Sequence, residues 1–533
     1  MSNELWDRYC SFYEKTFSEQ VQYNQQKLDD HFVKWKKGKM AERLGKTGVT
    51  RFEDIPLTTY DDYPILQEFG EAVEKQEKKC PRKKGEPIWD YYQRISQPLA
   101  PMLDGWLMDE YALCLKTSGS TGKSKWFVHG KSCIEACTAA MMPMALFACS
   151  NEWGKPRIEE RSTAMTVLAP LPYGSGMAAK LFADHFEIMP PMWVQEEVTD
   201  MRKKIALLLK YVEDGTPTDF VISSPSTMKM LCDYFTNPEQ LWKDRYQSMP
   251  IGIGKLVLYI KYLQSKSSRK YVKARDILPL KGLIICGWDG TIYLDYLRDQ
   301  FNIEPFNLYA ISDICLPLMG RPHRKWDMFP NLSIMHYEFL DGKGEIKKIQ
   351  ELSRNVVYEL VATVFGSCPT RYRVGDLFRV VDFETDGMPI FRFEGRTVGL
   401  IDICNYYRMS EALARDALSL SGFHSENWAI CHEVSPKERL KFLLEKDADF
   451  TEEQLARRLF EALRKTFPDF ETYVRDFKVN DPGEAIEVEY LKKGAFLRYM
   501  MRKQKEGVSF GQIKPPKVIG DKQHDLAELL RNV

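Results

Sequence analysis

The chain has 533 residues, too many for one ordinary hydrophobic core, so its length predicts a large domain and a smaller one. Hydrophobic residues make up 44% and charged residues 28%, which is the balance of a soluble globular enzyme. Lys and Arg number 75, as do Asp and Glu, so the formal net charge is zero. That neutral total gives no support for binding a nucleic acid.

Twelve cysteines are scattered without a C-x-x-C pair, which is typical of small buried residues in a reducing compartment. Cys133 and Cys137 stand four apart on a probable helix, and we interpret them in the same way. No secretory signal opens the chain, and the most lipid-like run, 137–149, is too short to span a bilayer. We therefore expect a soluble cytoplasmic protein with no membrane partner.

Two stretches near the amino terminus differ in pattern. Apolar side chains recur at near-helical intervals over residues 4–36 and predict one or two amphipathic helices that pack on the main body. Residues 74–86 are densely charged and contain one proline, so we expect a solvated loop there.

Residues 117–125 read TSGSTGKSK, in which hydroxyl side chains and glycines alternate. Glycines let backbone N–H groups turn toward an anion, hydroxyls add donors, and Lys125 adds a mobile positive charge. A Walker-type loop is excluded because Thr117 stands where that motif needs a glycine. An ordinary polar turn is the remaining alternative to a phosphate-binding loop.

From residue 163 onward, short apolar runs alternate with helical segments. Runs over 163–174, 219–235, 280–301 and 305–313 each begin as a buried strand, and Ser224 followed by Pro225 predicts a helix start. This alternation predicts an α/β fold with a mostly parallel sheet covered by helices. Ligands bind such sheets at the carboxyl ends of the strands.

The pattern changes again toward the carboxyl terminus. Residues 356–363 and 376–396 read as antiparallel strands with a hairpin turn at Asp386-Gly387. A separate α+β unit follows, in which Thr451 and Gln454 form a capping box for a helix that Pro468 stops. We expect a large domain over 1–396 and a small one over 397–533.

Three motifs in order resemble those of the adenylate-forming superfamily, which contains acyl-CoA synthetases, luciferases and peptide-synthetase adenylation domains. Residues 117–125 resemble its phosphate loop. Residues 307–313 (NLYAISD) resemble its aromatic loop, which implies that Tyr309 stacks on adenine and that Asp313, where the superfamily usually has Glu, helps to hold Mg²⁺. Residues 371–376 (RYRVGD) resemble its ribose motif, with Asp376 as the carboxylate and Arg396 as the hinge arginine that follows. The resemblance implies ATP-binding roles for Ser118, Gly119, Ser120, Thr121, Gly122, Tyr309, Ser312 and Asp376.

Further segments are similar to one branch, the auxin-responsive acyl acid-amido synthetases best known from plants. They are 52–63 (FEDIPLTTYDDY), 335–341 (MHYEFLD) and 492–519 (KKGAFLRYMMRKQKEGVSFGQIKPPKVI). The Pro-Lys-x-x-x-Gly-Lys type ending of ordinary acyl-CoA synthetases is absent. Residues 366–370 (GSCPT) depart from the Gly-Leu-Tyr approach that is usual in this branch.

This resemblance implies two half-reactions. A substrate carboxylate attacks the α-phosphorus of Mg·ATP to form an acyl-AMP, and the amine of an amino acid then attacks the acyl carbonyl to form an amide. Lys125 and Arg396 would supply positive charge, and Lys514 would reach the α-phosphate region. The small domain would rotate about Arg396 between the two steps.

Three alternatives stay open. An acyl-CoA ligase would share the first step, and a non-catalytic nucleotide-binding protein could use the same fold. A nucleic-acid site in the basic stretch 261–275 is less favoured than a solvated helix face. The sequence contains no zinc-ligand spacing and no G-x-S-x-G nucleophile motif, and it does not specify the acid, the acceptor or the oligomeric state.

Overall fold

The computed structural model describes most of the chain. It covers residues 4–117, 125–166, 168–198, 207–208, 210–212, 215–236, 273–286, 290–397, 401–403, 407–433, 439–446, 450–476, 479–505 and 515–519. Over these ranges, no helix combines the length and the apolar character needed to cross a bilayer.

Helices form the amino-terminal region, and the first two of them confirm the amphipathic helices predicted over residues 4–36. The helices are α1 (Glu4–Cys10), α2 (Phe17–Trp35), α3 (Lys39–Arg43), α4 (Pro64–Lys79) and α5 (Ile88–Ser96), with short 3₁₀ turns at Phe52–Asp54, Tyr60–Asp62 and Gln97–Leu103. A capping box between Thr16 and Glu19 starts α2. The loop predicted over 74–86 is wrong in its first part, because α4 continues through it. Val73 faces the core while Glu74 pairs with Lys116 at 2.8 Å, so the charged residues form the outer face of a helix.

A twelve-stranded sheet runs through the large region in the order β11-β10-β12-β13-β14-β9-β8-β7-β6-β5-β3-β4. One half contains five parallel strands, as the alternating pattern predicted: β3 (Thr163–Thr166), β4 (Glu187–Met189), β5 (Phe220–Ser223), β6 (Gly282–Cys286) and β7 (Phe306–Ile311). The helices among them are α6 (Lys131–Ala148), α7 (Gly174–Ala183), α8 (Met192–Glu197), α10 (Pro225–Thr236), α13 (Ala274–Ile277) and α14 (Gly290–Phe301). The Ser224 hydroxyl accepts from the Thr227 N–H at 3.3 Å, which confirms the predicted cap of α10.

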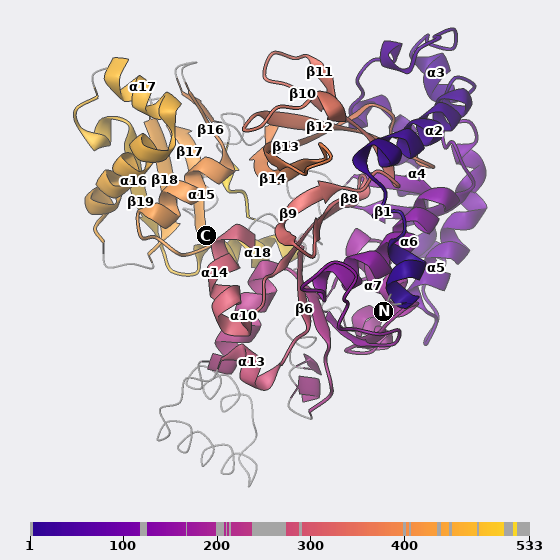
Figure 1. The fold of residues 1–533 in the computed structure, drawn as a ribbon, viewed down its shortest axis with the longest axis horizontal. Coiled ribbons are helices and arrows are strands. Elements are labelled where there is room, and N and C mark those ends of the chain that lie inside the picture. Colours follow the sequence, from indigo (N-terminus) through magenta and orange to yellow (C-terminus); the bar gives the residue numbers. More distant parts are fainter. Residues whose placement is uncertain are drawn as a thin grey trace.

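Side-chain alternation explains why helices cover both faces of this half (Figure 1). Phe220 and Ile222 of β5 pack into the core cluster that contains α6 and α7. Val221, between them, packs into a second cluster with residues of α10 and α14. Successive strand residues point to opposite faces, so an unbroken apolar strand needs a helical layer on each side.

The other half of the sheet is antiparallel, which confirms the antiparallel strands predicted over 356–363 and 376–396 and makes the sheet as a whole mixed. It contains β8 (Cys315–Arg321), β9 (Arg324–Pro330), β10 (Met335–Leu340), β11 (Ile346–Lys348), β12 (Val357–Val364), β13 (Tyr372–Phe383) and β14 (Pro389–Arg396). Gly387 has φ of +87° in the β13–β14 turn, as the hairpin prediction requires.

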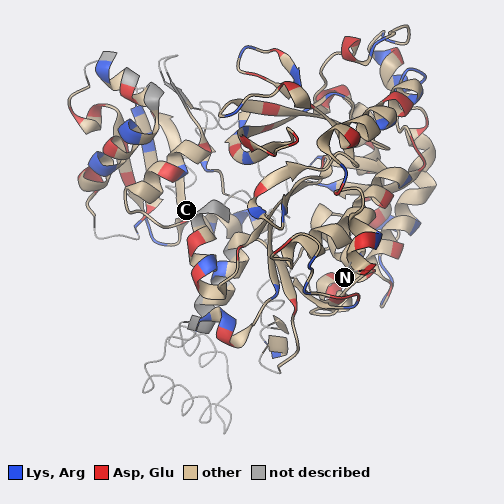
Figure 2. Cartoon of the chain, in the orientation of Figure 1, with Lys and Arg blue, Asp and Glu red and all other residues tan. Residues whose placement is uncertain are grey.

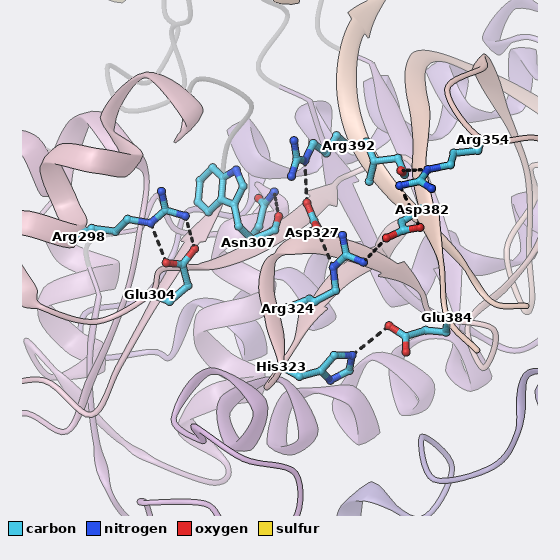
Figure 3. Close-up of polar contacts among 12 residues, drawn as sticks. Arg298, Glu304, Asn307, His323, Arg324, Asp327, Arg354, Asp382, Glu384 and Arg392 are labelled. Carbon is cyan, nitrogen blue, oxygen red and sulfur yellow. Dashed lines mark hydrogen bonds and ion pairs between the residues drawn. The ribbon is translucent and has the colours of Figure 1, made fainter. Parts of the chain in front are cut away.

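Charged side chains reinforce the joint between β9 and β14. The backbones of these strands pair at Phe391 of β14 and Met328 of β9. Beside that pair, the Asp327 carboxylate binds Arg392 at 2.7 Å and Arg324 at 2.8 Å (Figure 3). The ion pairs therefore tie the hairpin β8–β9 to the antiparallel strands where the backbone ladder is short.

A smaller α+β unit follows β14 and lies beside the large sheet (Figure 1). Its strands are β15 (Ile401–Ile403), β16 (Tyr407–Met409), β17 (Trp428–Glu433), β18 (Arg439–Glu445), β19 (Ile486–Leu491) and β20 (Val518–Ile519). Its helices are α15 (Glu411–Leu420), α16 (Glu452–Thr466), α17 (Pro468–Asp476) and α18 (Ala495–Lys505). The Thr451–Gln454 capping box is confirmed, and α16 ends before Pro468, which starts α17. This unit has hydrophobic clusters of its own, whereas the boundary at Arg396 stays a prediction.

Charge is distributed evenly over the described ribbon. Figure 2 shows Lys and Arg interspersed with Asp and Glu on the amino-terminal helices and on the helices of the smaller unit. This agrees with the zero net charge. The basic stretch 261–275 falls almost entirely outside the described residues.

Candidate active site

The predicted phosphate loop joins the two strands of a small hairpin, β1 (Tyr111–Lys116) and β2 (Trp126–Gly130). Two hydrogen bonds hold the ends of the loop together: the Thr117 N–H donates to the Lys125 carbonyl at 2.8 Å, and the Lys125 N–H donates to Thr117 Oγ1 at 2.9 Å. The Lys125 ammonium lies 4.9 Å from the centre of the Tyr60 ring. Ser118, Gly119, Ser120, Thr121 and Gly122 lie outside the described residues.

Three of the predicted site residues meet where β7, β13 and β14 come together. The Tyr309 hydroxyl donates to Asp376 Oδ2, and Arg396 Nε donates to Asp376 Oδ1 at 2.9 Å. Asp376 and Arg396 are direct cross-strand partners on β13 and β14. The Asp376 side chain is 2% exposed, whereas that of Arg396 is 33% exposed. A buried carboxylate is thus oriented on both oxygens beside a partly exposed guanidinium.

Tyr309 is the hydroxyl donor of this group. Its ring packs edge-on against Phe378, with centroids 4.9 Å apart, and lies at 24° to the Phe393 ring. Burial, and then the charge of Asp376, raises the pKa of Tyr309 well above its ordinary value. The hydroxyl therefore stays protonated and can donate to Asp376 across the working pH range. The sequence motif had not indicated this hydroxyl–carboxylate contact.

Asp313 follows β7 at its carboxyl end, as the motif predicted. Burial, and then the charge of Asp376, raises the pKa of Asp313 to about 6, while the positive charges of Arg396 and Lys125 act in the opposite direction. The Tyr372 hydroxyl donates to Asp313 Oδ2 at 3.2 Å. The neighbouring positive charges do not fully offset the cost of burying the ionised Asp313 carboxylate. A cation bound beside this carboxylate would therefore be favoured.

Ser312, also among the predicted residues, connects the turn after β7 to the β1–β2 hairpin. Its hydroxyl lies 3.5 Å from the Lys116 carbonyl. Its own carbonyl accepts from His129 Nε2 of β2 at 3.0 Å. These contacts position the turn that carries Asp313 next to the hairpin that carries the phosphate loop. No pattern in the sequence had indicated His129.

Arg371 opens the ribose motif but lies in a different environment. Its guanidinium makes a bidentate ion pair with Glu338, in which Nε and Nη2 donate to the two carboxylate oxygens at 2.9 and 2.8 Å. It also donates to the Glu53 carbonyl at 2.6 Å and to the Ile55 carbonyl. The segments 52–63, 335–341 and 371–376, which carry much of the resemblance, therefore meet at this one buried arginine. Lys514 lies outside the described residues.

Comparison with solved structures places the chain in a known fold. The structure matches an acyl acid amido synthetase, GH3.15, in complex with 2,4-DB, with a TM-score of 0.62 and 14% identity over 96% of this chain and 95% of that one. The chain has the fold of the acyl acid amido synthetases. A second GH3.15 acyl acid amido synthetase structure matches with a TM-score of 0.62 and 16% identity, over 91% of this chain and 88% of the other.

Sequence comparison agrees with the fold over a limited span. A probable indole-3-acetic acid-amido synthetase, GH3.7 of Oryza sativa subsp. japonica, is 30% identical over 128 residues. That match spans 20% of this chain and 20% of the relative. No protein-family profile matches the chain. The resemblance drawn from the motifs is thus confirmed at the level of the fold.

Proposed function

We propose that the protein is an ATP-dependent ligase that activates a carboxylic acid as an acyl-adenylate and joins the acyl group to an amino acid as an amide. The observation that carries this proposal is the convergence of Tyr309, Asp376 and Arg396 at one point of the sheet. The fold shared with acyl acid amido synthetases supports the same reaction.

The site would bind the nucleotide through both its ribose and its phosphates. A carboxylate can accept hydrogen bonds from two ribose hydroxyls, and Asp376 is held for that role by Tyr309 and Arg396. The predicted loop residues Ser118, Ser120 and Thr121 would bind phosphate oxygens. The hairpin that closes this loop is hydrogen-bonded to the Ser312 turn, so the two ends of the site are connected.

Catalysis of the first step would rest on positioning and on neutralising charge at the phosphate oxygens. Lys125 and Arg396 are the basic groups placed for this among the described residues. The Asp313 carboxylate fits Mg²⁺, which prefers oxygen ligands, because a nearby cation would offset the cost of burying its charge. Bound Mg²⁺ would neutralise the triphosphate.

In the second step, the amine would displace AMP from the acyl-adenylate, because pyrophosphate has already left in the first step. We assign Lys514 to the α-phosphate region, and we assign the hinge between the domains 1–396 and 397–533 to Arg396. The neutral amine of the amino acid attacks the acyl carbonyl and loses a proton, an amide bond forms, and AMP leaves with the electron pair of the broken C–O bond.

A screen in two stages tests the proposed function. Carboxylic acids are first incubated with the protein, Mg·ATP and hydroxylamine, and we expect at least one acid to give a hydroxamate. That acid is then supplied with each amino acid and with CoA, and the product mass is measured. An amide with an amino acid supports the proposal, whereas a CoA thioester as the only product favours an acyl-CoA ligase.

A matched pair of variants locates the chemistry. Lys514→Ala should lower amide formation strongly, while Lys465→Ala, on the exposed face of α16, should leave it unchanged. Failure of every acid to support hydroxamate formation, with Mg·ATP binding also absent, would refute the assignment.

A further inference from the structure

A histidine and two cysteines meet in the core directly behind the Ser312 turn. They are His129 of β2, Cys133 of α6 and Cys315 of β8, and all three are buried. The Cys133 and Cys315 sulfurs are 3.7 Å apart, and each lies 3.7 Å from His129 Nδ1. Three soft donor atoms from distant parts of the chain thus form a nearly equilateral triangle.

The hydrogen bonds of His129 show which of its two ring nitrogens carries the hydrogen in the neutral state. Nε2 lies 3.0 Å from the Ser312 carbonyl, and a carbonyl can only accept, so Nε2 carries the hydrogen. In the neutral ring, the Nδ1 lone pair accepts from the Ser367 hydroxyl 2.8 Å away, so a bound metal would take that lone pair in place of the Ser367 hydrogen. Histidines that bind metals usually donate their second ring N–H in this way, because that contact sets the tautomer and the ring orientation.

The triangle has the dimensions of a tetrahedral zinc site. With Zn–S near 2.3 Å and Zn–N near 2.05 Å, tetrahedral geometry places two sulfurs about 3.8 Å apart and a sulfur about 3.6 Å from a nitrogen. The observed separations of 3.7 Å lie between these values. Cys137 lies one turn beyond Cys133 on the same face of α6, but its sulfur is not part of this group of three donor atoms.

We propose that His129, Cys133 and Cys315 bind one Zn²⁺ ion in the core, and that Cys137 turns toward the ion to take the fourth position. On binding, Cys133 and Cys315 each release a thiol proton, and Cys137 releases a third when it takes the fourth position. Two thiolates and a neutral imidazole balance the charge of the ion, so the three-ligand core of the site buries no net charge.

The position of the site suggests a structural role. All of its ligands are buried, so substrates would have no access to the ion. Through the His129–Ser312 contact, the ion would fix the turn that carries Asp313 relative to α6 and β2. The site does not depend on the proposed ligase activity, and neither does its test.

Metal analysis of the full-length protein tests the proposal. Protein produced in zinc-supplemented medium is desalted, and its zinc is measured by mass spectrometry. We expect one equivalent per chain in the wild type and in Cys149→Ser, a control at another buried thiol beside the end of α6. Cys133→Ser and Cys315→Ser should lose that zinc, and Cys137→Ser should bind it more weakly against a competing chelator.

Cobalt substitution gives an answer that needs no variant. Wild-type protein refolded with Co²⁺ should show the visible bands of tetrahedral cobalt and a thiolate-to-cobalt charge-transfer band. Two outcomes overturn the proposal: a cobalt protein without the charge-transfer band, or zinc that is far below one equivalent and equal in the wild type and Cys315→Ser. In either case the 3.7 Å contacts are ordinary hydrogen bonds between buried thiols and an imidazole.

Discussion

Two arginine–carboxylate pairs lie at opposite ends of the short segment 371–376, and they differ in how much of the arginine is exposed. The side chains of Arg371 and Glu338 are only 6% and 4% exposed. The same guanidinium also donates to two backbone carbonyls. In the second pair, Asp376 is 2% exposed but Arg396 is 33% exposed. The first pair is enclosed by protein on all sides, whereas the second borders solvent.

The difference in exposure indicates that the Arg371–Glu338 pair is structural, whereas the Arg396–Asp376 pair is open to a ligand. A charge pair closed off from solvent can hold strands together, but no ligand can reach it. A carboxylate that is oriented by its neighbours and borders a partly exposed guanidinium can receive a polar ligand at little reorganisation cost. The resemblance motif thus contains one residue for stability, Arg371, and one that we assign to the nucleotide, Asp376.

The largest expected effect is the loss of stability when the structural pair is broken. Arg371→Met leaves Glu338 buried without its partner, and we expect a loss of about 3–5 kcal/mol in the free energy of unfolding. Urea denaturation measures this loss. The control is Arg8→Met, which removes an ion pair whose side chains are 66% and 49% exposed and should cost about 1 kcal/mol or less. Equal losses in the two variants would contradict the structural role of Arg371.

A second prediction concerns the pH dependence of stability on the structural side of the segment. His31 Nε2 lies 2.9 Å from the Thr370 hydroxyl, and burial lowers the pKa of His31 from 6.5 to about 4. The unfolded chain therefore takes up this proton first as the pH falls. The stabilisation is complete above pH 6.5 and declines by about 3 kcal/mol toward pH 4.

Urea denaturation across this pH range checks the effect. His31→Gln should reduce the decline in stability, whereas His424→Gln, at an exposed position, should not change it. ATP affinity at neutral pH should be unaffected by either change. An unchanged decline in His31→Gln would show that His31 is not the group that takes up the proton.

A smaller effect is expected on the binding side, and there it should appear in ligand affinity. Asp376→Asn keeps the shape of the side chain but removes the charge to which we assign the ribose hydroxyls. We expect ATP binding to weaken by about 1.5–3 kcal/mol, roughly 10- to 100-fold, and the unfolding free energy to change by about 1 kcal/mol or less. Calorimetric titration with ATP and urea denaturation measure the two quantities. A large loss of stability with unchanged ATP affinity would reverse the roles that we assign to the two pairs.

Much of the local structure followed from the sequence alone. The Ser224 cap, the Thr451–Gln454 capping box and the Asp386-Gly387 turn were all predicted, because each depends on residues a few positions apart. The alternation of strands and helices predicted the parallel half of the sheet. The order of the motifs indicated the fold that the structural comparison then supported.

Other features were decided only by the tertiary structure. The motif included Arg371 without showing that Glu338 and two distant carbonyls enclose it. Cys133 and Cys315 are 182 positions apart and read as ordinary core residues until the fold brought their sulfurs together beside His129. The physical reason is that local periodicity and capping act within a few residues, whereas burial, ion pairing and pKa depend on which strands pair across the sheet.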